Sequence, residues 1–202
     1  MLALRRTSPP QLVLWPTGPG ELIKLQNENI ADYYYGNWLP DGKRILFAGN
    51  EAGHGPRCYI QPIEGGKARP VTPEGILLPL VEHPVSPDGK LFTAIGPDHK
   101  AVIYPVEGGE PRPIPGLEPW DMPIRWSADG RSLYVFRTSQ VPARVYRLDL
   151  STGRKQLWKE LMPFDPAGVT DVYAVHLAAD ASWYFYTYSR RLSDLYLVDG
   201  LR

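Results

Sequence analysis

Four aspartates recur in nearly the same local sequence, and a repeated carboxylate could serve metal binding or acid–base catalysis. They are spaced 47, 41 and 51 residues apart: Asp41, Asp88, Asp129 and Asp180. Gly follows the first three and Ala the fourth. An Asp-Gly pair is typical of a tight turn, because the carboxylate accepts backbone N–H groups and Gly adopts positive φ without steric cost. A degenerate turn tolerates the loss of Gly better than a metal site does, so we interpret the aspartates as turn residues.

Few other residues have the spacing of a catalytic or metal-binding site. The sequence has no G-x-S-x-G elbow, P-loop, kinase signature or H-E-x-x-H motif. The single cysteine, Cys58, excludes an internal disulfide and a thiolate-rich zinc site. The histidines are scattered without metal-ligand spacing: His54, His83, His99 and His176. We therefore expect no catalytic residue, no metal and no cofactor, and a chain that is not an enzyme.

The composition fits a folded chain of many short strands. Of 202 residues, 43% are apolar, and the 22 Lys and Arg balance the 22 Asp and Glu. This balance gives no field toward nucleic acid or an anionic membrane, so we expect no nucleic-acid partner. The 22 prolines and 19 glycines are typical of short strands joined by tight turns. No apolar run approaches the ~18 residues of a membrane span, and the start lacks a signal-peptide pattern, so we expect no membrane insertion by this chain.

A second signature follows each turn, and the two together define a repeating unit. Three segments share an alternating strand, a tight turn and a short strand: "YIQPIEGGKARPVTP", "VIYPVEGGEPRPIPG" and "VYRLDLSTGRKQLW". Each unit therefore predicts four strands in meander order, A to D. Four strands within ~40–50 residues match the blade of a β-propeller. Frequent Pro and Gly and apolar residues in alternation argue against helices. We predict an all-β propeller of four-stranded antiparallel blades.

About five blades are represented in one propeller domain over residues 1–202. Their predicted bounds are 1–26 (partial), 31–73, 80–116, 122–159 and 171–199 (partial). The first blade would lack strand A and the last strand D, so the two ends overlap instead of completing one blade. An open ring leaves strand edges unpaired. We therefore expect an incomplete segment of a larger ring that self-associates through its edges. A strained five-bladed ring and an arc completed by another molecule are the alternatives.

The inner strands hold the first group of candidate binding residues. Three residues before each turn aspartate stands an apolar residue that should pack between blades: Trp38, Val85, Trp126 and Leu177. One residue earlier, alternation turns the side chain to the other side of the inner strand. The polar residues at that position are candidates to line the central channel: Asn37, Arg125 and His176.

The rim loops hold the second group, because loops on a rigid scaffold commonly carry binding. Exposed aromatic and acidic side chains dominate such contacts. The candidates for contact with a protein partner or small ligand are Tyr33, Trp120, Asp121 and Phe164. The run "DYYYGNW" (residues 32–38) is either a stacking platform or, in part, core between blades.

The repeat resembles a known type of propeller. "SPDGK" followed by a strand and "G-G-x-x-R-P" is similar to the WD-like repeat of TolB-type proteins and of prolyl oligopeptidase and dipeptidyl peptidase propellers. More narrowly, "IRWSADGRSLYVFR", "PARVYRLDLSTGR" and "YSRRLSDLYLVDGLR" resemble the C-terminal propeller of bacterial serine/threonine protein kinases of acidobacterial type. None of those families' catalytic residues has a counterpart in this sequence.

This resemblance implies three possible roles. The first is a non-catalytic sensor or scaffold that binds a protein or ligand within a larger signalling protein. The alternatives are the substrate-gating propeller of a prolyl-oligopeptidase-like serine hydrolase and a TolB-like periplasmic interaction protein. Attachment to a membrane kinase would place the chain outside the cytoplasm, and the sequence itself does not specify the compartment.

Overall fold

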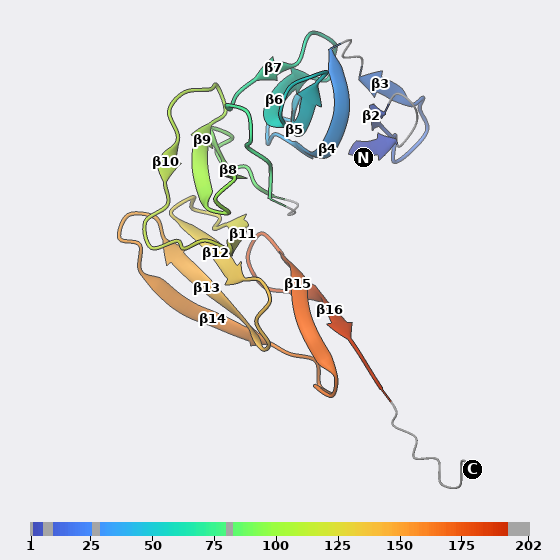
Figure 1. The fold of residues 1–202 in the computed structure, drawn as a ribbon. Coiled ribbons are helices and arrows are strands. Elements are labelled where there is room, and N and C mark those ends of the chain that lie inside the picture. Colours follow the sequence, from blue (N-terminus) through green and yellow to red (C-terminus); the bar gives the residue numbers. More distant parts are fainter. Residues whose placement is uncertain (1, 6–9, 26–28, 80–82, 194–202) are drawn as a thin grey trace, which may run out of the picture.

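The fold is all-β, as the sequence predicts. The computed structural model describes residues 2–5, 10–25, 29–79 and 83–193, and in these ranges it contains strands and no helix. Figure 1 shows successive small sheets that follow one another along a curved, open arc from the N-terminal to the C-terminal end. No helix in the described ranges is long and apolar enough to cross a membrane.

Five antiparallel sheets make up the arc, each formed by strands that are consecutive in the chain. The first contains β1 (Leu2–Arg5), β2 (Gln11–Leu14) and β3 (Ile23–Leu25). The second contains β4 (Ile30–Trp38), β5 (Arg44–Glu51), β6 (Arg57–Pro62) and β7 (Arg69–Pro70). The third contains β8 (Leu91–Ile95), β9 (Ala101–Pro105) and β10 (Arg112–Pro113).

The fourth sheet is again four-stranded and the fifth has two strands in the described residues. The fourth contains β11 (Asp121–Trp126), β12 (Ser132–Arg137), β13 (Ala143–Asp149) and β14 (Lys155–Leu161). The fifth contains β15 (Val169–Leu177) and β16 (Tyr184–Arg190). The further strand predicted near the C-terminus falls largely on residues 194–202, outside the described residues.

One hydrophobic cluster fills each junction between successive sheets. Leu12 of the first sheet packs with Phe47 of the second, and Leu46 of the second packs with Phe92 of the third. The next two junctions are built in the same way, around Leu133 and Val175 respectively. The inner sheets are therefore covered on both faces, and burial of apolar surface between sheets holds the arc together.

The repeated aspartates close the turns between the first two strands of the units. In every copy the aspartate Oδ1 accepts the backbone N–H of the residue two positions later, at 2.8–3.1 Å. The following residue has φ of 65°, 70° and 68° at Gly42, Gly89 and Gly130, and 56° at Ala181. Hydrogen bonds from the Ser86 hydroxyl and the Lys90 N–H lower the pKa of Asp88. These contacts confirm the turn interpretation.

The third unit departs from the predicted four strands, because its inner strand is broken. Leu77 bridges to Ile95 and Val85 bridges to Phe92, so eight residues on the inner edge separate bridges whose partners are three residues apart. Pro79 and Pro84 lie in that segment, and proline has no N–H to donate to a strand ladder. In the described residues, the predicted inner strand of this unit is represented by isolated bridges.

Candidate functional site

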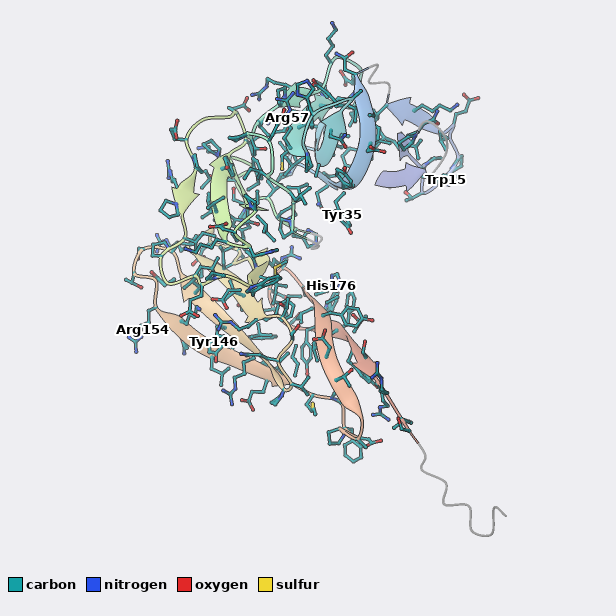
Figure 2. The ribbon with its side chains drawn as sticks, in the orientation of Figure 1. Trp15, Tyr35, Arg57, Tyr146, Arg154 and His176 are labelled. Atoms are coloured by element: carbon teal, nitrogen blue, oxygen red, sulfur yellow. The ribbon has the colours of Figure 1, made fainter. Side chains whose placement is uncertain are left out.

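A recess gathers aromatic side chains from the second, third and fourth units. Its cavity volume is about 560 Å³. The side chains that define it, called here the aromatic recess, are Tyr34, Tyr35, Leu77, His99, Trp120 and Met122. Figure 2 labels Tyr35, one of these side chains.

A β-bulge in β4 supplies two adjacent tyrosines. Tyr33 pairs with Gly49 and Tyr35 with Ala48, so Tyr34 is one extra residue in the ladder. A bulge re-aims side chains that would otherwise alternate between faces. Tyr34 and Tyr35 are consequently 39% and 48% exposed, and both line the recess. The Tyr34 hydroxyl donates to Asn50 Oδ1 at 2.8 Å, which holds its ring in place.

The opposite wall is a stacked pair with a constrained backbone. The His99 and Trp120 rings lie 3.8 Å apart between centroids, with an interplanar angle of 17°. The backbone φ angles of His99 and Trp120 are 59° and 71°, in the left-handed region that residues other than Gly seldom adopt. The Trp120 N–H donates to the His99 carbonyl at 3.1 Å. Strained conformations of this kind cluster at binding and catalytic sites.

Residues 77–79 of the third unit also line the recess. Leu77 is exposed beside the bridge to Ile95, whereas Leu78 is buried in the cluster between the second and third sheets. Pro79 also lines the recess. Among the described residues, no Asp, Glu, Lys or Arg lines the cavity, so its wall is apolar, aromatic and uncharged.

Asp121 is a buried anchor beside Trp120. It was predicted as an exposed rim residue, but it is 4% exposed. Its carboxylate accepts from Arg137 Nε at 3.0 Å, Lys155 Nζ at 2.6 Å and the Glu118 N–H at 2.9 Å. Burial alone would raise the pKa of Asp121, but these hydrogen bonds outweigh burial and lower the pKa. The cluster ties the loop that carries Trp120 to β12 and β14.

Two of the other rim candidates do not line the recess. Tyr33 is 7% exposed and packs against Phe47 with ring centroids 5.3 Å apart, so its assignment as a surface residue was wrong. The bulge explains this, because it separates Tyr33 from its exposed neighbours. Phe164 is fully exposed in the loop between β14 and β15.

The inner-strand candidates lie on three different sheets. Arg125 Nη1 donates to the Leu177 carbonyl at 3.0 Å and lines a second hollow of about 390 Å³ together with Trp38. His176 stacks on Phe185 with centroids 4.4 Å apart, and Asn37 is half-buried on β4. The structure therefore does not bring Asn37, Arg125 and His176 into one cluster with Trp120.

The apolar inner-strand positions mostly pack as predicted. Trp126 and Leu177 are buried, Val85 is partly buried, and the Trp126 indole N–H donates to the Pro84 carbonyl at 2.9 Å. Trp38 is the exception, because it is 37% exposed and borders the second hollow. Its assignment to the core between blades was wrong.

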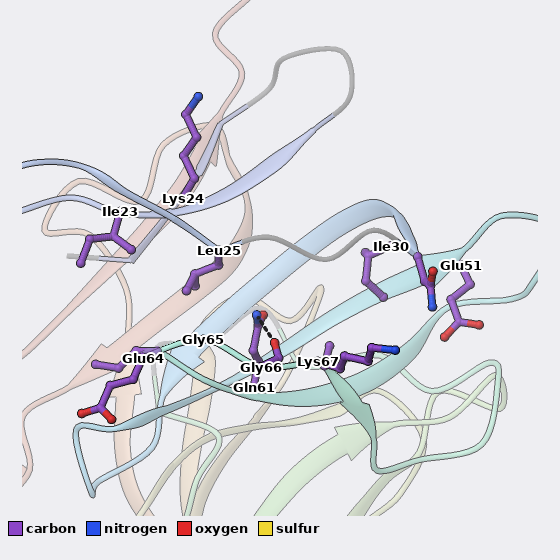
Figure 3. Close-up of a pocket in the computed structure, with 13 residues that line it drawn as sticks. Ile23, Lys24, Leu25, Ile30, Glu51, Gln61, Glu64, Gly65, Gly66 and Lys67 are labelled. Carbon is purple, nitrogen blue, oxygen red and sulfur yellow. Dashed lines mark hydrogen bonds between the residues drawn. The ribbon is translucent and has the colours of Figure 1, made fainter.

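A third hollow of about 530 Å³ lies between the first and second sheets. Figure 3 shows the charged side chains Lys24, Glu64 and Lys67 pointing in different directions around it. The Gln61 side-chain amide N–H donates to the Gly66 carbonyl at 3.1 Å within its wall. Because its charges diverge, this hollow offers a less defined binding chemistry than the aromatic recess.

Cys58 is packed in the core. It is fully buried, and burial raises the pKa of its thiol to about 12. The thiolate is the nucleophilic form of cysteine, so a thiol with this pKa is inert at neutral pH.

Sequence reasoning found part of the recess. Trp120 was singled out, and the "DYYYGNW" run was recognised as either a platform or core. Tyr33 is core, while Tyr34 and Tyr35 are exposed. His99 entered the sequence analysis only as one of the scattered histidines, and nothing in the sequence indicates its stacking on Trp120. Leu77 carried one usable signal, the neighbouring prolines in "LLPLVEHPV".

Solved structures with a similar fold are β-propellers. TolB from Acinetobacter baumannii matches with a TM-score of 0.62 and 18% identity, over 93% of this chain and 51% of that one. A chain of the nidogen/laminin complex matches with a TM-score of 0.60 and 14% identity, over 90% of this chain and 65% of that one. Comparison of the sequence with protein-family models and with curated proteins finds no match.

Enzymes share this architecture, which corrects one expectation. The periplasmic gluconolactonase PpgL from Pseudomonas aeruginosa matches with a TM-score of 0.54 and 18% identity, over 90% of this chain and 57% of that one. The inference that the chain is not an enzyme was therefore wrong, because its fold is also that of enzymes. The chain spans about half the length of the Acinetobacter TolB structure, and its fold is that of a TolB-like β-propeller, present in part.

Proposed function

We propose that this chain is the binding module of a TolB-like propeller and that it holds a protein or ligand in the aromatic recess. The observation that carries the proposal is the convergence of Tyr34, Tyr35 and Trp120 from two different units on one uncharged cavity. Large exposed aromatic rings supply contact area at a low cost in side-chain entropy and dominate binding hot spots. Their exposure indicates a surface that is covered when a partner binds.

The rest of the fold supports this role by keeping the recess rigid. The Asp121 cluster, the His99–Trp120 backbone hydrogen bond and the Tyr34–Asn50 hydrogen bond each hold one wall. A rigid wall loses little conformational entropy on binding. Within a longer protein the module would act as a scaffold or sensor, and its association with a kinase stays a prediction.

A fragment screen tests the proposal. Neutral aromatic and aliphatic fragments are added to the full chain, and saturation-transfer NMR reports which of them bind. We expect hits whose signal is lost in Trp120→Ala and in Tyr35→Ala. Trp15→Ala is the matched control, since Trp15 is 53% exposed, Trp120 is 52% exposed, and Trp15 lies outside the recess. Hits that survive both recess variants, or an absence of hits, would contradict the proposal.

A further inference from the structure

The aromatic recess has the chemistry of a site for a proline-rich peptide. We propose that it binds a short, uncharged proline-rich segment of a protein partner in the polyproline II conformation. This inference rests on the proposed function and specifies its ligand. Charge, hydrogen-bond donors and rigidity of the recess each favour this ligand.

The lining of the recess offers no partner for an ion pair. Among the described residues that line it there is no Asp, Glu, Lys or Arg. A charged ligand would lose hydration on entering without gaining an oppositely charged side chain. An uncharged segment avoids this cost, and aromatic-lined grooves are a known mode of recognition for proline-rich chains.

Hydrogen-bond donors on the recess wall match the carbonyl acceptors of such a peptide. Within the described part of the chain, the Tyr35 hydroxyl and the Trp120 indole N–H, although on the recess wall, make no hydrogen bond. Polyproline II has no internal hydrogen bonds, so its carbonyl groups are free to accept them. Proline also has no N–H that would be left without a partner against an apolar wall. A wall with available donors therefore fits a ligand with available acceptors.

Both the recess wall and the proposed peptide are rigid before they bind. The positive φ angles of His99 and Trp120 and their ring stacking fix the indole before any ligand arrives. A polyproline II segment is likewise ordered before binding, so neither partner loses much conformational freedom. The volume of about 560 Å³ holds a segment of several residues instead of one side chain.

A titration with two capped peptides tests the inference. The first is acetyl- and amide-capped decaproline, and the second is a capped Gly-Ser peptide of the same length. The full chain is titrated with each while NMR follows the indole N–H signal of Trp120, assigned by its loss in Trp120→Ala. We expect saturable binding of decaproline and at least ~10-fold weaker binding of the Gly-Ser peptide.

Three variants locate the peptide site. Trp120→Ala should weaken decaproline binding by ~10-fold or more, since it removes a stacking face and a donor. Tyr35→Phe keeps the ring and removes only the hydroxyl, so a smaller loss of about threefold is expected. Trp15→Ala should bind decaproline like the unaltered chain. Thermal unfolding of each variant verifies that it is folded.

The outcomes separate this inference from the proposed function. Equal binding of both peptides, or binding of neither while fragments still bind at Trp120, overturns the proline-rich ligand and leaves the binding module standing. Decaproline binding that Trp120→Ala and Tyr35→Phe leave unchanged places the peptide elsewhere and also overturns the inference. Failure of both fragments and peptides overturns both proposals.

Discussion

The third and fourth units have closely similar Asp-Gly turns but differ in their inner strands. In the fourth sheet, β11 pairs with β12 from Asp121 to Trp126, interrupted by one bulge. In the described residues of the third unit, the inner edge pairs with β8 through isolated bridges, Leu77 with Ile95 and Val85 with Phe92. The regular unit contributes Met122 to the aromatic recess, and the irregular one contributes the exposed Leu77.

This difference shows how a repeat fold can acquire a site without losing its core. The clusters that join the third sheet to its neighbours persist although its inner strand is broken. On the inner edge, backbone hydrogen bonds still join Leu77 to Ile95 and Thr93 to Pro84, and the burial between sheets is kept. Sites on repeat scaffolds are therefore best sought where one copy breaks the pattern of the others.

The largest loss of stability should come from substitutions in the cores of the third and fourth units. Phe92→Ala in the third sheet and Leu133→Ala in the fourth each remove a fully buried side chain. We expect losses of about 3–5 and 2–5 kcal/mol in the free energy of unfolding, measured by urea denaturation. A loss below about 1 kcal/mol for Phe92→Ala alone would show that the broken inner strand uncouples the third unit, contrary to our interpretation.

An intermediate effect should come from Asp121, which anchors the regular inner strand. Asp121→Asn removes the charge that holds Arg137 and Lys155, and we expect a loss of about 2–3 kcal/mol in urea denaturation at pH 7. The lowered pKa of Asp121 contributes stability above the unfolded value of ~3.9, and this stability is lost as pH falls through the lower folded pKa. The acid limb of the stability profile should therefore be shallower in Asp121→Asn, and an unchanged limb would contradict the anchor role.

The smallest effect on stability should come from the Asp turns that the second to fifth units share. Gly89→Ala places a side chain at φ 70°, where an added Cβ meets only ordinary contacts, so we expect a cost of about 1 kcal/mol from the backbone alone. Ala181→Gly is the reciprocal change at φ 56° and should stabilise by up to about 1 kcal/mol. Thermal unfolding measures both, and changes of the same sign would show that the fourth turn is not equivalent to the others.

Several parts of the site were predictable from particular residues. Trp120 stood out as an aromatic residue in a rim loop, and the adjacent tyrosines of "DYYYGNW" were visible as a possible platform. The burial of Tyr33 and Asp121 was not predictable. The burial of Tyr33 depends on a bulge in β4. The burial of Asp121 depends on Arg137 and Lys155, which lie 16 and 34 residues further along the chain. Alternation and loop position alone misplaced both residues.

The amino-acid sequence by itself determined the all-β class, the repeated Asp-Gly turns and the meander of short strands, because these depend on local backbone preferences and on alternation of apolar residues. Only the tertiary structure decided which aromatic rings meet. His99 and Trp120 belong to loops of different units, and their stacking follows from how those units pack. The order of strands is a local property of the chain, whereas a recess is a property of neighbours brought together by burial between sheets.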